Sequence, residues 1–354
     1  MTEQTIPEYL SYATTNHASD IFIIAGRPLS FKIDGKLTSH GERLMPDDTE
    51  NLLRHIYQMA NGRNFDHFLD TGDDDFSFSI PGLSRFRVNT YRQRGSLAAV
   101  IRVIAFELPD PDVLNIPEDV MSAADFSKGM VLVTGPAGSG KSTTLACIID
   151  RINHSREGHI ITLEDPLEYL HRHDKCIVSQ REICTDTESY LVSLRATLRQ
   201  SPDVILLGEM RDYETIQTAM TAAETGHLVL SSLHTTGAAN TIGRIVDVFE
   251  PAQQRQISIQ LSMVLQAVIS QQLVPDVNGH TIPVFEVMRL NPAIRNMIRD
   301  NKVHQIDGVI ASSAHEHMRS MDQSLLELYK QKKLTKETAL KFASNADMLK
   351  RKLL

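Results

Sequence analysis

The sequence contains little cysteine, no tryptophan and no long apolar run. Its three cysteines, Cys147, Cys176 and Cys184, form no C-x-x-C pair, so neither a disulfide framework nor a cysteine-based zinc site is expected. No run approaches the roughly eighteen apolar residues that span a bilayer. The first residues, MTEQTIPEYL, lack the basic start and apolar stretch of a secretory signal. We therefore expect a cytoplasmic protein that does not span the membrane.

The sequence also lacks an excess of positive charge. It has 36 Lys and Arg against 44 Asp and Glu in 354 residues, which gives a formal net charge of -8. Binding to a nucleic-acid backbone needs clustered basic residues, so nucleic acid is not an expected partner. Apolar residues make up 42% of the chain, which is ordinary for a globular protein. The length favours two domains over one.

Residues 1–107 are predicted to form a small α+β domain, since helical apolar spacing alternates with strand-like runs. The predicted helices are Ile6–Thr15 and Pro46–Phe68, and the predicted strands are Ile21–Ile24, Leu29–Ile33, Asp75–Ile80, Arg85–Asn89 and Ala98–Val103. Asp34-Gly35 and Pro81-Gly82 separate strand-like runs and are predicted to be turns. Three prolines then follow in a short span, at 109, 111 and 117. Because proline interrupts regular structure, residues 108–119 are predicted to be an interdomain linker.

Residues 120–354 are predicted to form an α/β domain. Short apolar runs, mostly separated by helical segments, occur at Met130–Val133, His159–Leu163, Val204–Leu207 and Leu228–Leu233. Such runs suit a parallel sheet that is buried on both faces. The chain beyond about residue 290 has helical spacing.

One predicted helix in that last region has a recognisable start and two distinct faces. Asn291 is suited to cap a helix and Pro292 to its first turn. The apolar residues Ala293, Ile294, Met297 and Ile298 fall on one face at helical spacing, with Arg295, Asn296, Arg299 and Asp300 mostly on the other.

The segment GPAGSGKS matches the phosphate-loop pattern G-x-x-x-x-G-K-[ST] at every position, between a predicted strand and the predicted helix Thr143–Ile152. Glycines let the backbone wrap a phosphate chain, and the helix N-terminus adds positive potential. Lys141 is expected to reach the β- and γ-phosphates of ATP, and the Ser142 hydroxyl to ligate Mg²⁺. The predicted nucleotide-binding residues are Gly135, Pro136, Ala137, Gly138, Ser139, Gly140, Lys141, Ser142 and Thr143.

Polar residues stand at the ends of three further predicted strands, where ligands of parallel sheets bind. Glu209 is the candidate base or water-positioning group for hydrolysis. Glu164 and Asp165 would orient water or Mg²⁺, and His234 would sense the γ-phosphate. His227, directly before the same strand as His234, is also a candidate. The alternatives are a surface carboxylate for Glu209, a helix cap for Glu164 and Asp165, and a core or turn role for each histidine.

Two other clusters contain potential metal ligands, His171-Arg172-His173-Asp174 and His315-Glu316-His317. Neither has the H-E-x-x-H spacing that places two imidazoles on one face of a helix. Metal binding by either cluster is therefore not predicted.

Four segments together resemble motifs of the secretion-ATPase superfamily of RecA-like motors, specifically its type IV pilus retraction branch. Ile161–Tyr169 is similar to the Asp box, Pro202–Asp212 to the Walker B region and Thr225–Thr236 to the His box of that family. Ala293–Asp300 is similar to the A-I-R-N-L-I-R-E signature of the retraction branch, with Met297 in place of Leu and Asp300 in place of Glu.

The resemblance implies a homohexamer with a PAS-like N-terminal domain and a RecA-like ATPase domain, in which ATP binds between the domains and against the neighbouring subunit. It also implies that N-terminal arginines act on the phosphates. The candidates are Arg85, Arg87, Arg92, Arg94 and Arg102, of which Arg87 and Arg102 are favoured; the alternative is solvated strand-edge charges. The implied partners are an inner-membrane platform protein and the pilus machinery, which would bring the chain to the inner face of the cell membrane to drive retraction and twitching motility.

Three other functions are weighed against retraction. Pilus-assembly, secretion and conjugation ATPases of the same superfamily commonly carry a four-cysteine zinc insertion and extra N-terminal domains. This chain has no C-x-x-C pair and begins almost directly at the PAS-like domain. A nucleic-acid motor is disfavoured by the acidic balance, and a non-hydrolysing scaffold by the presence of Ser142, Glu209 and His234.

Overall fold

The structure, a computed structural model, describes residues 5–33, 35–104, 108–210, 212–313 and 316–353. These residues divide into two compact units. One unit comprises residues 5–104 with Glu168–Leu170, and the other comprises residues 108–167 and 171–353. Each unit buries its own hydrophobic core.

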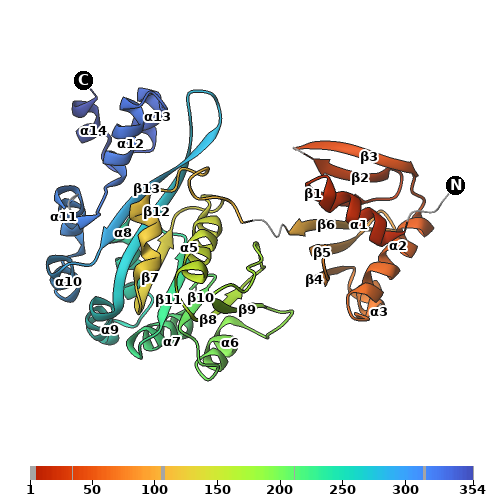
Figure 1. The fold of residues 1–354 in the computed structure, drawn as a ribbon, viewed down its shortest axis with the longest axis horizontal. Coiled ribbons are helices and arrows are strands. Elements are labelled where there is room, and N and C mark those ends of the chain that lie inside the picture. Colours follow the sequence, from red (N-terminus) through yellow and green to blue (C-terminus); the bar gives the residue numbers. More distant parts are fainter. Residues whose placement is uncertain (1–4, 34, 105–107, 211, 314–315, 354) are drawn as a thin grey trace. The chain divides into compact units, whose positions relative to one another are not determined.

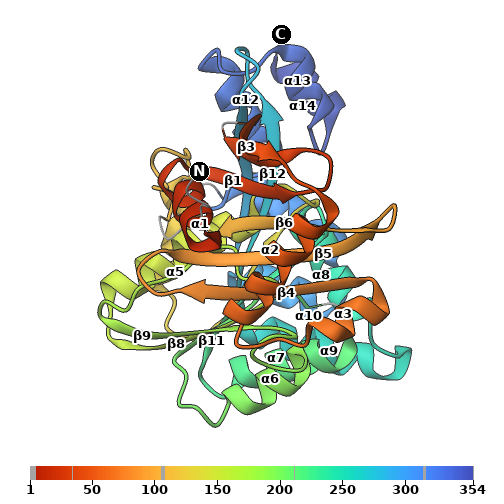
Figure 2. The same ribbon diagram turned by 90° about the vertical axis from the view of Figure 1, so that its right-hand side faces the viewer.

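The N-terminal unit is an antiparallel sheet covered by helices (Figure 1). Its elements are α1 (Ile6–Thr15), β1 (Ala18–Ile23), β2 (Pro28–Ile33), β3 (Lys36–Arg43), α2 (Pro46–Met59), α3 (Phe65–Thr71), β4 (Asp73–Ile80), β5 (Ser84–Gln93) and β6 (Ser96–Ile104). Figure 2 looks onto this sheet, whose strand order is β3-β2-β1-β6-β5-β4. The fully buried aromatic residues Phe31, Phe68 and Phe86 lie in its core, as expected for a PAS-like α+β domain.

Two predictions for this unit were wrong. The helix predicted over Pro46–Phe68 is two helices, because Asn61 and Gly62 adopt positive φ angles of 56° and 69° and end the first. The strand β3 was not predicted, because its side chains are almost all exposed and show no apolar alternation. Asp34, half of one predicted turn, lies outside the described residues.

The second unit is built on a mixed sheet. Its strands are β7 (Gly129–Thr134), β8 (Gly158–Glu164), β9 (Cys176–Glu182), β10 (Val204–Leu207), β11 (Leu228–Leu233), β12 (Leu265–Pro275) and β13 (Thr281–Arg289). Its helical elements are α4 (Glu118–Met121), η1 (Ser122–Asp125), α5 (Lys141–Ser155), α6 (Tyr190–Thr197), α7 (Tyr213–Glu224), α8 (Ala238–Asp247), α9 (Pro251–Val264), α10 (Pro292–Arg299), η2 (Val303–Gln305), α11 (Ile306–Ser312), α12 (Met321–Lys330), α13 (Lys336–Lys341) and α14 (Ala346–Lys352).

Alternate residues of the central strands bury against opposite layers of helices (Figure 1). On β7, Met130 and Leu132 join the cluster that contains α7, α8 and α9. Val131 and Val133 join the cluster that contains α4 and α5. This two-sided burial explains why these strands are apolar throughout, as the sequence predicted for an α/β domain.

The strand order is β13-β12-β7-β11-β10-β8-β9, and β13 pairs with β12 in the antiparallel direction. The four strands predicted from apolar runs, β7, β8, β10 and β11, pair in parallel as expected, and the antiparallel edge is formed by a strand that was not predicted. The sequence prediction also missed β9, β12 and β13. Polar residues such as Gln271 and Glu286 interrupt the apolar pattern inside β12 and β13.

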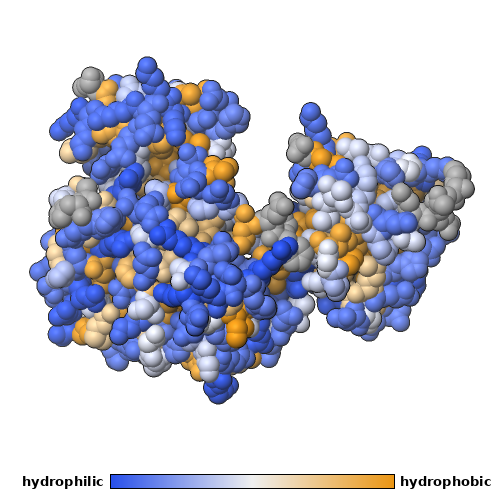
Figure 3. All heavy atoms as spheres, viewed as in Figure 1, coloured by the Kyte–Doolittle hydropathy of each residue, from blue (hydrophilic) through white to orange (hydrophobic). Residues whose placement is uncertain are grey.

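Residues 108–119, predicted to be a linker, belong to the second unit in the structure. Ile116 is buried in its core beside Val120 of α4. Among the described residues, no helix is both long and apolar enough to cross a bilayer. Hydrophilic residues cover most of the face seen in Figure 3.

The helix α10 begins as predicted, with Asn291 Oδ1 accepting a hydrogen bond from Ile294 N at 2.9 Å. Ile294 and Ile298 are buried, but Ala293 is exposed. Arg295 is half-buried and donates to the backbone carbonyls of Ser262 and Met263 at the end of α9. The polar face of α10 is therefore partly used in packing, because the Arg295 guanidinium satisfies carbonyls that the end of α9 leaves free.

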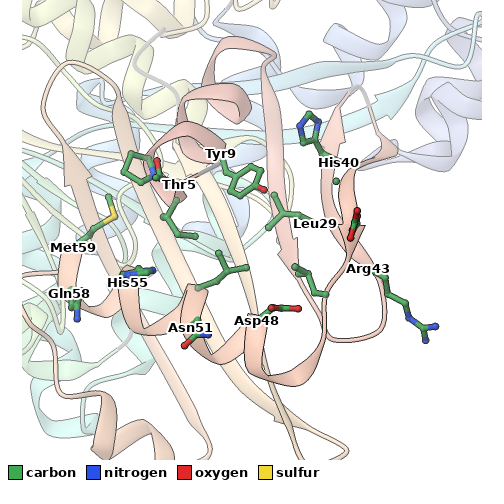
Figure 4. A pocket seen from close by; sticks show the side chains of 16 residues that line it. Thr5, Tyr9, Leu29, His40, Arg43, Asp48, Asn51, His55, Gln58 and Met59 are labelled. Atoms are coloured by element: carbon green, nitrogen blue, oxygen red, sulfur yellow. The ribbon is translucent and has the colours of Figure 1, made fainter. Parts of the chain in front are cut away.

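The N-terminal unit contains a pocket of about 910 Å³ between α1, α2 and the strands β2 and β3 (Figure 4). Tyr9 and His40 line it from one side, and Asn51 and His55 from α2. None of the predicted site residues lines this pocket.

Candidate active site

The phosphate loop joins the end of β7 to the start of α5. Its three glycines are required by space and by backbone conformation. Gly138 and Gly140 have φ angles of 74° and 85°, and a Cβ at Gly135 would lie 2.2 Å from the carbonyl oxygen of Gln271. The loop therefore packs closely against Gln271 of β12 and leads directly into the N-terminus of α5.

The Lys141 side chain folds back over this loop. Its Nζ donates to the carbonyl oxygens of Gly135 and Pro136, each at 2.9 Å. The Ser139 hydroxyl is buried and finds no hydrogen-bond partner among the described residues. A cradle that only glycine fits, a fixed ammonium and an orphaned hydroxyl together suit an oxyanion such as a phosphate.

Glu209 and His234 meet Lys141 at the carboxyl edge of the sheet. The Nε2 atom of His234 lies 3.4 Å from Oε2 of Glu209, and its Nδ1 atom lies 3.5 Å from Nζ of Lys141. An ammonium only donates hydrogen bonds, so this geometry suits a neutral imidazole with Nδ1 as acceptor and Nε2–H donating to the carboxylate. The phosphate-loop lysine and two residues predicted from separate strand ends are thus in one chain of contacts.

A pocket of about 400 Å³ opens beside this trio. Its polar lining comes from Glu209, Ser232, His234, Thr235 and Arg244. The apolar lining is Met210, Ile216, Leu233, Ile245 and Val248. The Glu209 side chain is only 12% exposed, so its carboxylate acts in a partly dry environment.

Glu164 and Asp165 lie on the same edge of the sheet. Glu164 is the last residue of β8, and Gly208 N donates to Leu163 O at 2.8 Å, which joins the ends of β8 and β10. Gln180 Nε2 donates to Glu164 Oε1 at 3.4 Å. The predicted position is therefore correct, while the roles of these two carboxylates stay predictions.

His227 lies at the other edge of the sheet. It precedes β11, whereas His234 follows it, and a six-residue strand spans about 20 Å. Its Nδ1 atom is 2.9 Å from the carbonyl oxygen of Ala222 at the end of α7. The structure does not bring His227 to the site, because the strand separates the two histidines.

The arginine candidates lie on β5, β6 and the turn between them, within the N-terminal unit. Arg87 and Arg102 stand opposite each other in the register of β5 and β6. Arg87 makes a two-pronged ion pair with Asp75, at 3.1 and 2.6 Å. Arg102 Nε donates to Asp20 at 3.1 Å, and its side chain is 69% exposed. The remaining candidates are Arg85, Arg92 and Arg94.

Gln271 contributes to the site and was missed in the sequence. It is buried on β12, and its Oε1 accepts a hydrogen bond from Thr144 Oγ1 at 2.8 Å. The glycine contacts described above place the phosphate loop directly against it. No local pattern marks this glutamine, since its neighbours in space come from a distant part of the chain.

The two histidine clusters do not assemble into metal sites within the described chain. His171 has a buried Nδ1, whereas His173 Nδ1 accepts a hydrogen bond from Val178 N at 3.0 Å. His317 Nδ1 lies 3.2 Å from Asp119, and His315 lies outside the described residues.

Lowering the pH from about 7 to about 5 should destabilise the fold through His171. Burial lowers the pKa of His171 to about 4, against about 6.5 in an unfolded chain. Between these values the unfolded state binds a proton that the folded state does not, so stability is complete above the unfolded pKa and falls as the pH drops. We expect a loss of about 2 kcal/mol over this range, measured by urea denaturation.

The control for this prediction is a pair of variants. His171→Gln should remove this part of the pH dependence, whereas His304→Gln, at an exposed position, should retain it. Equal pH dependence in wild-type and His171→Gln proteins would contradict the assignment.

A glycine-rich loop between strand and helix, with a lysine, a glutamate and a histidine converging on it, defines a P-loop ATPase with a RecA-like core. The chain belongs to the type II/IV secretion system protein family, whose sequence model matches residues 1–350.

Individual relatives are similar over nearly the whole chain. The type IV pilus retraction ATPase PilT of Pseudomonas aeruginosa is 42% identical over 337 residues, which are 94% of this chain and 96% of the relative. A crystal structure of the pilus retraction motor PilT with bound ADP is 44% identical, with a TM-score of 0.89, and the match covers 99% of this chain and 100% of that one. The ATPase DotB of Legionella pneumophila is 27% identical, with a TM-score of 0.81 and 96% of each chain covered.

Proposed function

We propose that this chain hydrolyses Mg·ATP as a homohexameric motor that powers type IV pilus retraction and twitching motility. The observation that carries the proposal is the contact chain from Lys141 through His234 to Glu209, in a chain that is similar to a retraction motor along its whole length. The higher identity to PilT than to DotB favours a pilus function over a secretion function.

The phosphate loop and Lys141 bind and orient the triphosphate. The loop's backbone N–H groups and the positive end of α5 face the phosphates, and the Lys141 ammonium exchanges the carbonyls of Gly135 and Pro136 for phosphate oxygens. These groups are already in position to stabilise the negative charge that develops on the transferred phosphoryl group.

Glu209 is the base or the orienting group for the attacking water. A carboxylate accepts hydrogen bonds from the water and holds its lone pair toward phosphorus. His234 lies between Glu209 and Lys141, so it fixes both side chains and reports whether a γ-phosphate is present. Glu164 and Asp165 orient water at the neighbouring strand end.

Magnesium fits the donor set of this edge. The Ser142 hydroxyl, in the first turn of α5, would hold the ion together with the phosphates, as hard oxygen ligands suit it. An ion held by Ser142 would neutralise negative charge on the phosphates. The carboxylates of Glu164 and Asp165 lie at the same edge and suit contacts through its waters.

The partners of this motor are further copies of itself and the inner-membrane platform protein of a pilus machine. In such a ring, Arg87 or Arg102 acts on the phosphates. The chain works in the cytoplasm at the inner face of the cell membrane, and it needs no nucleic acid.

The second candidate function is pilus assembly, secretion or conjugation by a motor of the same family. The family match favours it, since the matched model describes type II/IV secretion system proteins. Assembly and retraction differ in the direction of force, which the geometry of one ATP site leaves open.

Deleting the gene in its host separates the two functions. Loss of a retraction motor should leave surface pili in place, or in excess, while twitching stops. Surface pili are scored by electron microscopy and twitching by colony spreading, with the wild-type gene restored as the control. A deletion strain without pili would instead identify an assembly motor, and one with normal pili and normal twitching would exclude both.

A further inference from the structure

The segment after His234 is held by two side chains of the β12–β13 hairpin. Gly237 N donates to Ser270 Oγ at 2.9 Å, and Ala238 N donates to Glu286 Oε1 at 2.9 Å. Ser270 and Glu286 face each other in the register of the two strands. The first N–H groups of α8, which helices leave unpaired, are therefore anchored on this hairpin.

Glu286 also reaches a second helix. Its Oε2 atom accepts a hydrogen bond from Met321 N, at the start of α12, at 3.4 Å. Met321 and Leu325 of α12 belong to a separate hydrophobic cluster with α13 and α14. One carboxylate thus joins the start of α8, four residues after His234, to the C-terminal helices.

Burying the carboxylate of Glu286 at this position reduces the stability of the fold. The residue is only 6% exposed, and burial raises its pKa, with Asp307 and Asp322 adding to the rise and the two N–H donors opposing it. An apolar side chain would avoid that cost but leave two buried N–H groups unpaired. A glutamine could accept only one of the two bonds, because its NH₂ group cannot accept.

We propose that Glu286, assisted by Ser270, is a positioning residue for ATP hydrolysis that holds His234 against Lys141 and Glu209. The same carboxylate links the position of His234 to α12, so a shift of His234 is passed to the C-terminal helices. This inference rests on the proposed role of His234 in hydrolysis. It adds a residue whose hydrogen bonds go to the starts of α8 and α12 and not to the nucleotide loop.

Replacing Glu286 with glutamine tests the proposal. The amide places a donor against one N–H group, so α8 and His234 should shift, and a small misplacement of a catalytic group costs up to about 10²-fold in rate. We expect Glu286→Gln to lower kcat by about 10-fold while KM changes by less than about 2-fold, because the nucleotide loop is untouched. Steady-state phosphate release measures both constants, at a temperature where circular dichroism shows the variant folded.

The matched control is Glu327→Gln, which changes a glutamate of α12 itself. Glu327 pairs with Arg319 at 2.8 Å on the exposed side of α12, and within the described part of the chain it makes no bond to α8. It should retain wild-type kcat and KM. If Glu286→Gln protein does not fold, Ser270→Ala replaces it, since that change removes only the acceptor for Gly237 and should lower kcat by about 3-fold.

A double-mutant cycle with His234→Ala tests whether Glu286 affects kcat through His234. If Glu286 acts through His234, Glu286→Gln should lower kcat in the wild-type background and have little further effect in the His234→Ala background. A folded Glu286→Gln protein with wild-type kcat, or one with the same loss in both backgrounds, would overturn the inference. Wild-type turnover by His234→Ala protein alone would instead overturn the proposed role of His234.

Discussion

Replacing Glu209 with glutamine is expected to lower kcat for ATP hydrolysis by about 10²–10⁴-fold while ATP still binds. Glutamine has nearly the same shape as glutamate but cannot take a proton from water. The contact with His234 at 3.4 Å can persist through the amide oxygen, so the site should keep its geometry. Phosphate release measures turnover, and titration with a fluorescent ATP analogue measures binding.

Two further variants complete this experiment. Lys141→Ala should lose both binding and turnover, because Lys141 contacts the phosphates directly in the proposed mechanism. Glu214→Gln changes an exposed glutamate at the start of α7 and should behave as wild type. Near-normal phosphate release by Glu209→Gln protein would remove Glu209 from the catalytic role.

Replacing Arg87 with alanine is expected to lower turnover by about 10³–10⁵-fold if Arg87 is the arginine finger, which is about 4–7 kcal/mol of activation barrier. Within its own unit Arg87 pairs with Asp75, so the variant also loses an ion pair. Asp75→Asn removes the same ion pair but keeps the guanidinium. A finger role therefore predicts slow hydrolysis for Arg87→Ala and near-normal hydrolysis for Asp75→Asn.

The same logic applies to Arg102, whose partner is Asp20. Arg102→Ala and Asp20→Asn form a second pair of variants, and light scattering checks that all four proteins assemble. A finger supplied by a neighbouring subunit also predicts that turnover per subunit rises with protein concentration through an assembly threshold. A fully active monomer would contradict the ring. Normal turnover by both arginine variants would place the finger elsewhere in the chain.

The nucleotide site was largely predictable from the sequence, because its parts are local. The phosphate loop is one contiguous segment. Its glycines and lysine indicate phosphate binding wherever a strand precedes the segment and a helix follows it. Glu209 and His234 each end an apolar run, and parallel strands bring such ends to one edge of a sheet. The structure joins them within 3.4 Å, which agrees with that expectation.

The structure separates the two histidine candidates by their position along a strand, which the sequence pattern did not resolve. His227 and His234 flank the same six-residue strand, so both looked suitable. Direction separates them, since only the carboxyl end of a parallel strand faces the ligand edge. Arg295 shows the same limit: helical spacing placed it on the polar face of α10, but it did not show that the carbonyls at the end of α9 bind it.

The local sequence pattern was enough to predict an α+β unit followed by an α/β unit, the phosphate loop, and the strand ends that supply Glu209 and His234. It did not show that the β12–β13 hairpin places Gln271 against the phosphate loop and Glu286 against the start of α8. Gln271 accepts a hydrogen bond from Thr144, which is 127 residues away in the sequence. In the sequence alone, a polar residue inside an apolar run argues against a buried strand. Such residues become meaningful only when folding brings distant hydrogen-bond donors to them, because a buried polar group is stable only with its partner present.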